Sequence, residues 1–190
     1  MPTPFHSQAS NNAADGTVET QGDSLILRFE RYLHHTIEEV WAAITEPEQL
    51  VAWLAEADIE LREGGHVRLR WLSTDEHGNP ANVVMNATIT EFDPPRLLEY
   101  MGDAHGTLRF ELKEKAAGCV LIFSNTLPAS HTRLDESLAG WHVHLDFLEE
   151  ALEGQAVDWP HWPLDHWTRH YEHYCQKQEE EHSLWRAVKM

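Results

Sequence analysis

The stretch Leu134–Leu152, which reads LDESLAGWHVHLDFLEEAL, decides how the rest of this chain can fold. Its large apolar side chains recur at spacings of four and three residues, at Leu134, Leu138, Trp141, Leu145, Leu148 and Leu152. This period places them on one face of an α-helix. A helix with one apolar face has to cover another apolar surface, so the sequence predicts a long helix packed on the strands that precede it.

The segments before this helix are short runs in which apolar and polar residues alternate. In residues 66–72, for example, Val67, Leu69 and Trp71 alternate with polar side chains, which is typical of a strand with one buried face. Turn residues such as Gly64-Gly65 separate the runs. Further strands are expected at residues 25–29, 59–61, 83–92, 97–101, 107–112 and 119–126.

Two short helices are predicted between the first and second strands. Thr36-Ile37-Glu38-Glu39 has the spacing of a capping box, and Pro47 occupies the first turn of the next helix. The order is therefore strand, two short helices, a meander of strands and one long helix. This order indicates the α+β class, with an antiparallel sheet of about six or seven strands.

Composition limits the partners of the protein. The chain has 32 Asp and Glu against 14 Lys and Arg, which gives a formal net charge of -18. This balance argues against nucleic acid and against anionic lipid surfaces. No apolar run approaches the ~20 residues of a membrane span, no signal peptide is evident, and two cysteines do not suggest a disulfide framework. We therefore expect a cytoplasmic protein with no nucleic-acid or membrane partner.

Five motifs in this order resemble the SRPBCC superfamily, which includes START and Bet v1-like domains. Within it, the chain is similar to the branch of the C-terminal domain of activators of Hsp90 ATPase. The motifs cover roughly residues 24–153 and are Thr36-Ile37-Glu38-Glu39-Val40-Trp41, residues 46–54 (EPEQLVAWL), Gly64-Gly65, residues 89–98 (ITEFDPPRLL) and Gly140-Trp141. The resemblance implies a helix-grip fold, in which a curved sheet closes over the long C-terminal helix around an apolar cavity.

Three regions follow from this comparison. Residues 1–22 are small and polar, so a disordered leader is predicted. Residues 23–154 form the helix-grip domain. Residues 155–190 are a helical extension rich in Trp and His, which departs from the family pattern. Its segment Trp159-Pro160-His161-Trp162-Pro163 is expected to strap the extension onto the domain, to cover the cavity, or to join a homodimer.

The cavity of such a fold lies where the inward faces of the strands meet the last helix. The residues expected there are Trp71, Met85, Tyr100, Phe110, Phe123, Trp141, His144 and Leu145. Apolar walls with few polar groups are typical of small-ligand pockets, although large side chains also simply fill cores. His144 could orient a ligand, act as an acid or base, or be a hydrogen-bonded residue at the edge of the core.

A metal site is the alternative in the extension. His166, His170 and His173 stand at i, i+4 and i+7 and share one face of the expected helix. Two histidines four apart are a known zinc pairing. The neighbouring aromatic stripe favours a helix that docks on the domain instead (Trp167, Tyr171 and Tyr174). We therefore expect no metal and no other cofactor, and keep the three histidines as the candidate ligand set.

The favoured function is non-catalytic binding of a small hydrophobic molecule. One alternative is a chaperone-interacting stress-response protein, by analogy with Hsp90 activators. The other is a cyclase- or aromatase-like enzyme, which requires acid–base groups in the cavity. The fold alone does not separate these functions.

Overall fold

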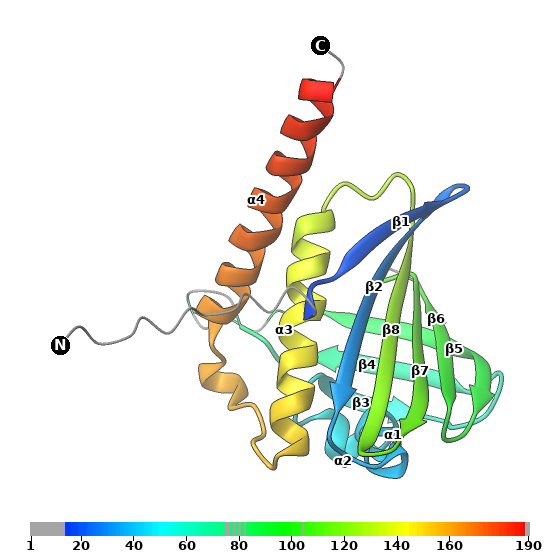
Figure 1. The fold of residues 1–190 in the computed structure, drawn as a ribbon. Coiled ribbons are helices and arrows are strands. Elements are labelled where there is room, and N and C mark those ends of the chain that lie inside the picture. The colour runs from blue at the N-terminus through cyan, green and yellow to red at the C-terminus, as the bar shows by residue number, and fades with distance from the viewer. Residues whose placement is uncertain are drawn as a thin grey trace.

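The computed structural model describes residues 14–74, 77, 79, 81, 83–103 and 105–188, with side chains up to residue 180. Within this part of the chain, eight strands form one antiparallel sheet in the order β1-β2-β8-β7-β6-β5-β4-β3 (Figure 1). The strands are β1 (Thr17–Gln21), β2 (Ser24–Leu33), β3 (Ala55–Ile59), β4 (His66–Trp71), β5 (Val84–Asp93), β6 (Leu97–Gly102), β7 (Thr107–Lys115) and β8 (Gly118–Pro128). The helical elements are α1 (Ile37–Thr45), α2 (Pro47–Leu50), α3 (Leu134–Leu152), the 3₁₀ turn η2 (Trp159–His161) and α4 (Leu164–Val188).

The two short helices begin where the sequence predicts. Thr36 Oγ1 accepts the backbone N–H of Glu39, and the Glu39 carboxylate accepts the N–H of Thr36, which confirms the capping box. Pro47 lies in the first turn of α2. Trp53, just beyond α2, is fully buried and donates from Nε1 to the carbonyl of Ala43 at 2.9 Å. This hydrogen bond holds α1 and the end of α2 together.

The sheet is curved and does not close into a barrel, and α3 lies against its concave face (Figure 1). Phe29, Leu69 and Phe123 of the strands are at most 1% exposed and belong to the same core as α3. On α3, the predicted stripe is buried at Leu138, Trp141, Leu145 and Leu148. The α+β class and the helix-grip arrangement are therefore confirmed.

The sheet has one strand more than the predicted six or seven. The additional strand is β1, which falls in the segment predicted as a leader and pairs antiparallel with β2 from Thr17–Arg28 to Gln21–Ser24. All five of its residues are exposed, so no apolar alternation marks it in the sequence. The first 13 residues of the predicted leader lie outside the described residues.

The C-terminal extension packs on the domain. Figure 1 shows α4 beside α3, on the side away from the sheet. Ahead of α4, Val157 N–H donates to the Ala52 carbonyl, and Trp159 Nε1 donates to the Val51 carbonyl at 2.7 Å. These bonds tie the extension to the turn after α2. The homodimer expected through this segment stays a prediction.

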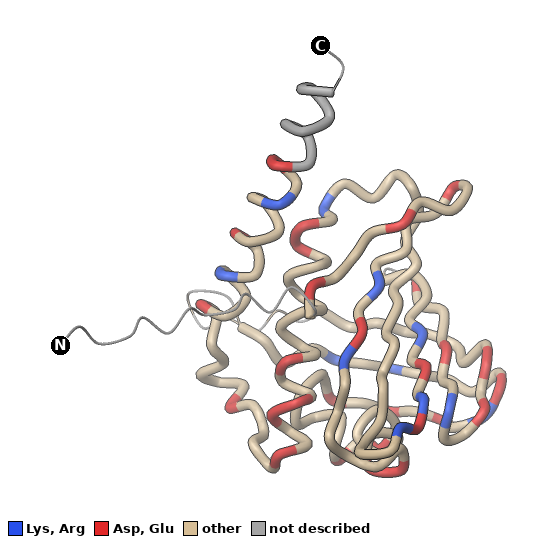
Figure 2. The backbone as a smooth tube through the Cα atoms, viewed as in Figure 1, with Lys and Arg blue, Asp and Glu red and all other residues tan. Residues whose placement is uncertain are grey.

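Acidic and basic residues are distributed over both the strands and the helices (Figure 2). On the outer face of the sheet, Arg109 pairs with Glu91, Glu99 and Glu111 at 2.8 to 3.0 Å. These carboxylates raise the pKa of the Arg109 guanidinium against the opposing effect of burial. The basic group is therefore neutralised locally. Among the described residues, no helix combines the length and apolar character needed to cross a membrane.

The glycine pair between β3 and β4 gives a test of the fold. A Cβ at Gly65 would overlap the carbonyl oxygen of Glu60, whereas at Gly64 its nearest neighbour would be Arg62 Nη1 at 3.8 Å. Gly65→Ala must shift backbone and is expected to lower the free energy of unfolding by about 3 kcal/mol. Gly64→Ala only places a Cβ at a φ of +74° and should cost about 1 kcal/mol. Urea denaturation measures both, and equal losses would contradict the prediction.

Candidate functional site

A pocket of about 250 Å³ lies between α3 and the sheet. Its walls come from six places: the end of β4, the segment between β4 and β5, the turn before β7, the strand β8, the segment before α3, and the face of α3 around Gly140. The curvature of the sheet brings these distant segments together at one end of the gripped helix. The pocket is therefore a product of the fold rather than of any local motif.

Aromatic rings form two of its walls. Trp71 stacks on His105 with ring centroids 4.8 Å apart and planes 10° from parallel. Trp141 faces the pocket from α3 and packs on Phe123 with centroids 4.5 Å apart. Two flat apolar surfaces at one opening suit a ring-shaped ligand.

Of the predicted cavity residues, Trp71, Trp141 and His144 line this pocket. The remaining predicted residues are at most 3% exposed and lie in the core: Met85, Tyr100, Phe110, Phe123 and Leu145. Burial raises the pKa of the Tyr100 hydroxyl, as expected for a phenol kept from water. These five side chains therefore fill the core, which was the alternative interpretation of these positions.

Several polar lining residues had no counterpart in the sequence-based prediction. Asn125 is 2% exposed and points inward from β8. Its Nδ2 donates to the carbonyls of His105 and Thr107, and its Oδ1 accepts Trp141 Nε1 at 3.0 Å. Asn125 thereby fixes both an aromatic wall and the turn before β7. A polar residue at an inward position of an apolar strand is the signal that could have identified it.

His144 is held by one backbone contact. Its Nδ1 lies 2.9 Å from the carbonyl oxygen of Trp53, and the ring packs edge-on against Phe147. Burial lowers the pKa of His144 to about 4, because the apolar surroundings disfavour the charged imidazolium. The ring is therefore neutral near pH 7 and lines the pocket as a hydrogen-bonding group.

Ser137 and His131 have the separation of a nucleophile and its base. Ser137 Oγ lies 2.9 Å from His131 Nε2, but it also lies 3.0 Å from the carbonyl oxygen of Arg133. A serine has one hydroxyl proton, and the Arg133 carbonyl can only accept it. Among the described residues, no third group orients His131 through Nδ1. The pair therefore does not form the triad that activates a nucleophile.

The predicted metal ligands do not converge. His170 Nε2 lies 3.0 Å from Asp146, His173 Nε2 lies 2.9 Å from Asp15, and His166 stacks on Phe147. One helix face thus meets three different neighbours, because the face is wide and α4 crosses several elements.

The structure instead groups His142, Asp146 and His170, whose nearest ligand atoms all lie within 4.8 Å of one another. The two imidazoles are stacked, with centroids 3.8 Å apart and planes 22° from parallel, so their in-plane lone pairs do not point to a common centre. Arg31 also lies 3.5 Å from Asp146 and occupies the place of a cation beside that carboxylate. The geometry favours a cross-link between α3 and α4 over a metal site.

Tyr174 completes this cluster. Its hydroxyl accepts the N–H of Gly16 at 2.8 Å and lies 2.8 Å from His142 Nδ1. Burial, followed by the charges of His170 and Arg31, lowers the pKa of His142 to about 4 against the opposing effect of Asp146. The cluster therefore joins α4, α3 and the segment before β1 through the buried rings of His142 and Tyr174.

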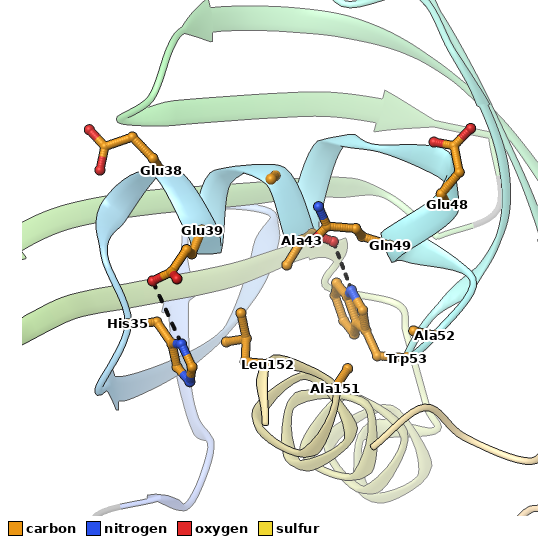
Figure 3. Close-up of a pocket in the computed structure, with 11 residues that line it drawn as sticks. His35, Glu38, Glu39, Ala43, Glu48, Gln49, Ala52, Trp53, Ala151 and Leu152 are labelled. Atoms are coloured by element: carbon orange, nitrogen blue, oxygen red, sulfur yellow. Dashed lines mark hydrogen bonds and ion pairs between the residues drawn. The ribbon is translucent and has the colours of Figure 1, made fainter. Parts of the chain in front are cut away.

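A second depression of about 460 Å³ lies between α1, α2 and the end of α3 (Figure 3). Small side chains such as Ala43, Ala52 and Ala151 form its floor, while Glu38 and Glu48 point outward at its rim. It is a groove between helices, and none of the predicted cavity residues lines it.

The curved sheet, the gripped helix and the pocket between them define a helix-grip domain. The family described as "Activator of Hsp90 ATPase homolog 1-like protein" matches residues 34–153, and the chain belongs to this family. The match begins after β2 and ends with α3, so the extension lies outside it. A search of curated proteins finds no match.

Solved structures share the fold. EF2215 from Enterococcus faecalis, a conserved protein of unknown function, is 23% identical with a TM-score of 0.69, over 89% of this chain and 93% of that chain. CalU16 from Micromonospora echinospora is 24% identical with a TM-score of 0.60, over 85% and 94%. An AHSA1-like protein from Aeromonas hydrophila is 20% identical with a TM-score of 0.59, over 68% and 92%. The first two matches cover 89% and 85% of this chain, which is more residues than the segment 1–154 contains. The structural similarity therefore extends into the C-terminal extension.

Tyr174→Phe tests the cross-link. The change removes one hydroxyl and leaves Gly16 N–H and His142 Nδ1 buried without their partner, so we expect a loss of about 2 kcal/mol in the free energy of unfolding. The control is Tyr171→Phe on the same helix, which keeps the ring stacked on Trp167 and should change stability by less than about 0.5 kcal/mol. Similar losses in both variants would refute the role of the hydroxyl.

His144→Gln tests the neutral state of His144. With a pKa of about 4 in the folded chain and about 6.5 when unfolded, protonation favours unfolding. The contribution is complete above pH ~6.5 and is lost as the pH falls toward 4. Glutamine keeps an N–H donor for Trp53 but takes no proton. Between pH 7 and 4.5, this variant should therefore lose about 2 kcal/mol less unfolding free energy than the wild type.

The measurement is equilibrium denaturation at both pH values. His161→Gln is the matched control, because that side chain is 82% exposed and should follow the wild type. A His144→Gln variant with the pH dependence of the wild type would show that His144 does not contribute in this way.

Proposed function

We propose that this protein binds a small, mainly apolar molecule in the pocket between the sheet and α3, without chemical turnover. The observation that carries the proposal is Gly140. This glycine lies in the middle of α3 and lines the pocket, and a Cβ there would meet no described atom within 4 Å outside its own helix. Packing therefore does not require glycine at this position.

The glycine is unfavourable for the helix itself. Glycine in a helix interior is about 1 kcal/mol less favourable than alanine, because it loses more backbone freedom on folding. Its presence without a steric need is consistent with keeping space above the helix open. The pocket of about 250 Å³ exceeds the ~150 Å³ of an engineered cavity that binds benzene, so one or two fused rings would fit.

Binding is favoured over catalysis by the lining. In the described part of the chain, no acid–base pair with an orienting third group faces the pocket, as a cyclase- or aromatase-like reaction would require. Chaperone contact rests on the family description alone, and stimulation of an Hsp90 ATPase by the purified chain would be its direct assay. The cytoplasmic location and the homodimer also stay predictions.

Gly140→Leu tests the proposal. The leucine side chain would project into the open space, so we expect affinity for naphthalene to fall at least about tenfold in calorimetric titration. Stability should be retained, because leucine is a better helix former than glycine. Native mass spectrometry of the freshly purified wild type should also show a bound small molecule that Gly140→Leu lacks.

The matched control places the same side chain elsewhere on α3. Glu150 is exposed and far along the helix from the pocket, so Glu150→Leu should bind naphthalene as the wild type does. Unchanged binding by a folded Gly140→Leu variant would refute this pocket as the binding site.

A further inference from the structure

The contact between His144 and Trp53 determines which nitrogen of the imidazole is protonated. A carbonyl oxygen only accepts hydrogen bonds, so Nδ1, at 2.9 Å from the Trp53 oxygen, carries the proton. In a neutral imidazole the other nitrogen, Nε2, then has a free lone pair. His144 lines the pocket, and no described residue is hydrogen-bonded to Nε2. The contact with Trp53 therefore makes Nε2 a hydrogen-bond acceptor that is available to a ligand in the pocket.

Asn125, Ser137 and His131, which also line the pocket, direct their hydrogen-bond donors to other protein groups. Both N–H groups of the Asn125 amide are directed to backbone carbonyls, and its oxygen accepts Trp141 Nε1. Ser137 donates to the Arg133 carbonyl and so accepts a hydrogen bond from His131 Nε2. The donors of these groups are thus already used within the protein.

His105 supplies a second unmet hydrogen-bonding group. Its ring lies on Trp71 at the pocket wall, and its Nδ1 is buried without a partner among the described residues. Buried polar atoms are nearly always paired, so an unpaired one at a pocket is a position to which a ligand can form a hydrogen bond.

The charge of the lining completes the argument. None of the described residues that line the pocket is Lys, Arg, Asp or Glu, although the chain as a whole is strongly charged. Among these described residues, a carboxylate or phosphate would find no Lys or Arg, and an ammonium group would find no carboxylate. Burying such a charge unpaired is strongly unfavourable.

We propose that the pocket selects an uncharged ring compound bearing a hydroxyl group, which lies between Trp71 and Trp141 and donates its hydrogen bond to Nε2 of His144. This inference rests on the proposed function and specifies its ligand class. The low pKa of His144 supports it, because the acceptor stays unprotonated across the neutral range.

Three matched probes test the inference on the full chain: 2-naphthol, 2-methylnaphthalene and 2-naphthoate. By calorimetric titration, the wild type should bind 2-naphthol about tenfold more tightly than 2-methylnaphthalene, the effect of one hydrogen bond, and 2-naphthoate most weakly. His144→Met removes the acceptor and should make the first two affinities equal. His144→Gln keeps both a donor for Trp53 and an acceptor for the ligand, so it should retain most of the preference.

A nitrogen NMR spectrum supplies a measurement that does not depend on variants. His144 should show a protonated Nδ1 and an unprotonated Nε2 in the free protein, and 2-naphthol should shift the Nε2 resonance. Any of four results would overturn the inference while leaving the proposed function intact. The first is a protonated Nε2, and the second is equal wild-type affinity for 2-naphthol and 2-methylnaphthalene. The others are a preference for 2-naphthoate, or a preference for 2-naphthol that persists in a folded His144→Met variant. Failure of all three probes and of naphthalene to bind would overturn both.

Discussion

The burial of α3 on two sides is the constraint on which the rest of the structure depends. One side, with Trp141 and Leu145, fills the concave face of the sheet, and the other, with His142 and Phe147, meets the extension. A helix buried on two sides keeps polar side chains on those sides only where each finds a partner. The partners of its histidines therefore specify where the neighbouring elements must lie, and the pocket is the space that remains at one end.

The turn after α2 connects these neighbours. The successive carbonyls of Val51, Ala52 and Trp53 accept Trp159 Nε1, Val157 N–H and His144 Nδ1 respectively. Carbonyls at the end of a helix lack partners within it, and here the extension and α3 supply them. Trp162 Nε1 continues the contact to the carbonyl of Thr74, at the segment that borders the pocket. The extension therefore shapes the site, although the family match ends before it.

The local periodicity of the sequence predicts most of the fold but only part of the candidate site. The stripe on α3 and the capping box at Thr36 are visible in sequence because they depend on residues three or four apart. Trp141 belongs to the helical stripe, and Trp71 follows from the two-residue alternation of its strand. Asn125 and His105 are 20 residues apart in the chain and meet only across the sheet, so their pairing has no local signature. The strand β1 is stabilised by its partner strand rather than by burial, which leaves no pattern to detect.

The histidines show why residue type and spacing could not locate the site. His142 and His144 are two residues apart, both are buried, and burial lowers the pKa of each to about 4. In His142, Nδ1 lies at Tyr174 and Nε2 lies 3.7 Å from Asp146, so both nitrogens face protein groups and the ring cross-links α3 to α4. His144 lines the pocket, its Nδ1 is bonded to the Trp53 carbonyl, and its Nε2 has no hydrogen-bond partner among the described residues. The two residues differ in whether the protein itself provides partners for both ring nitrogens. A nitrogen without a protein partner is available to a ligand, which distinguishes a ligand-binding histidine from a structural one.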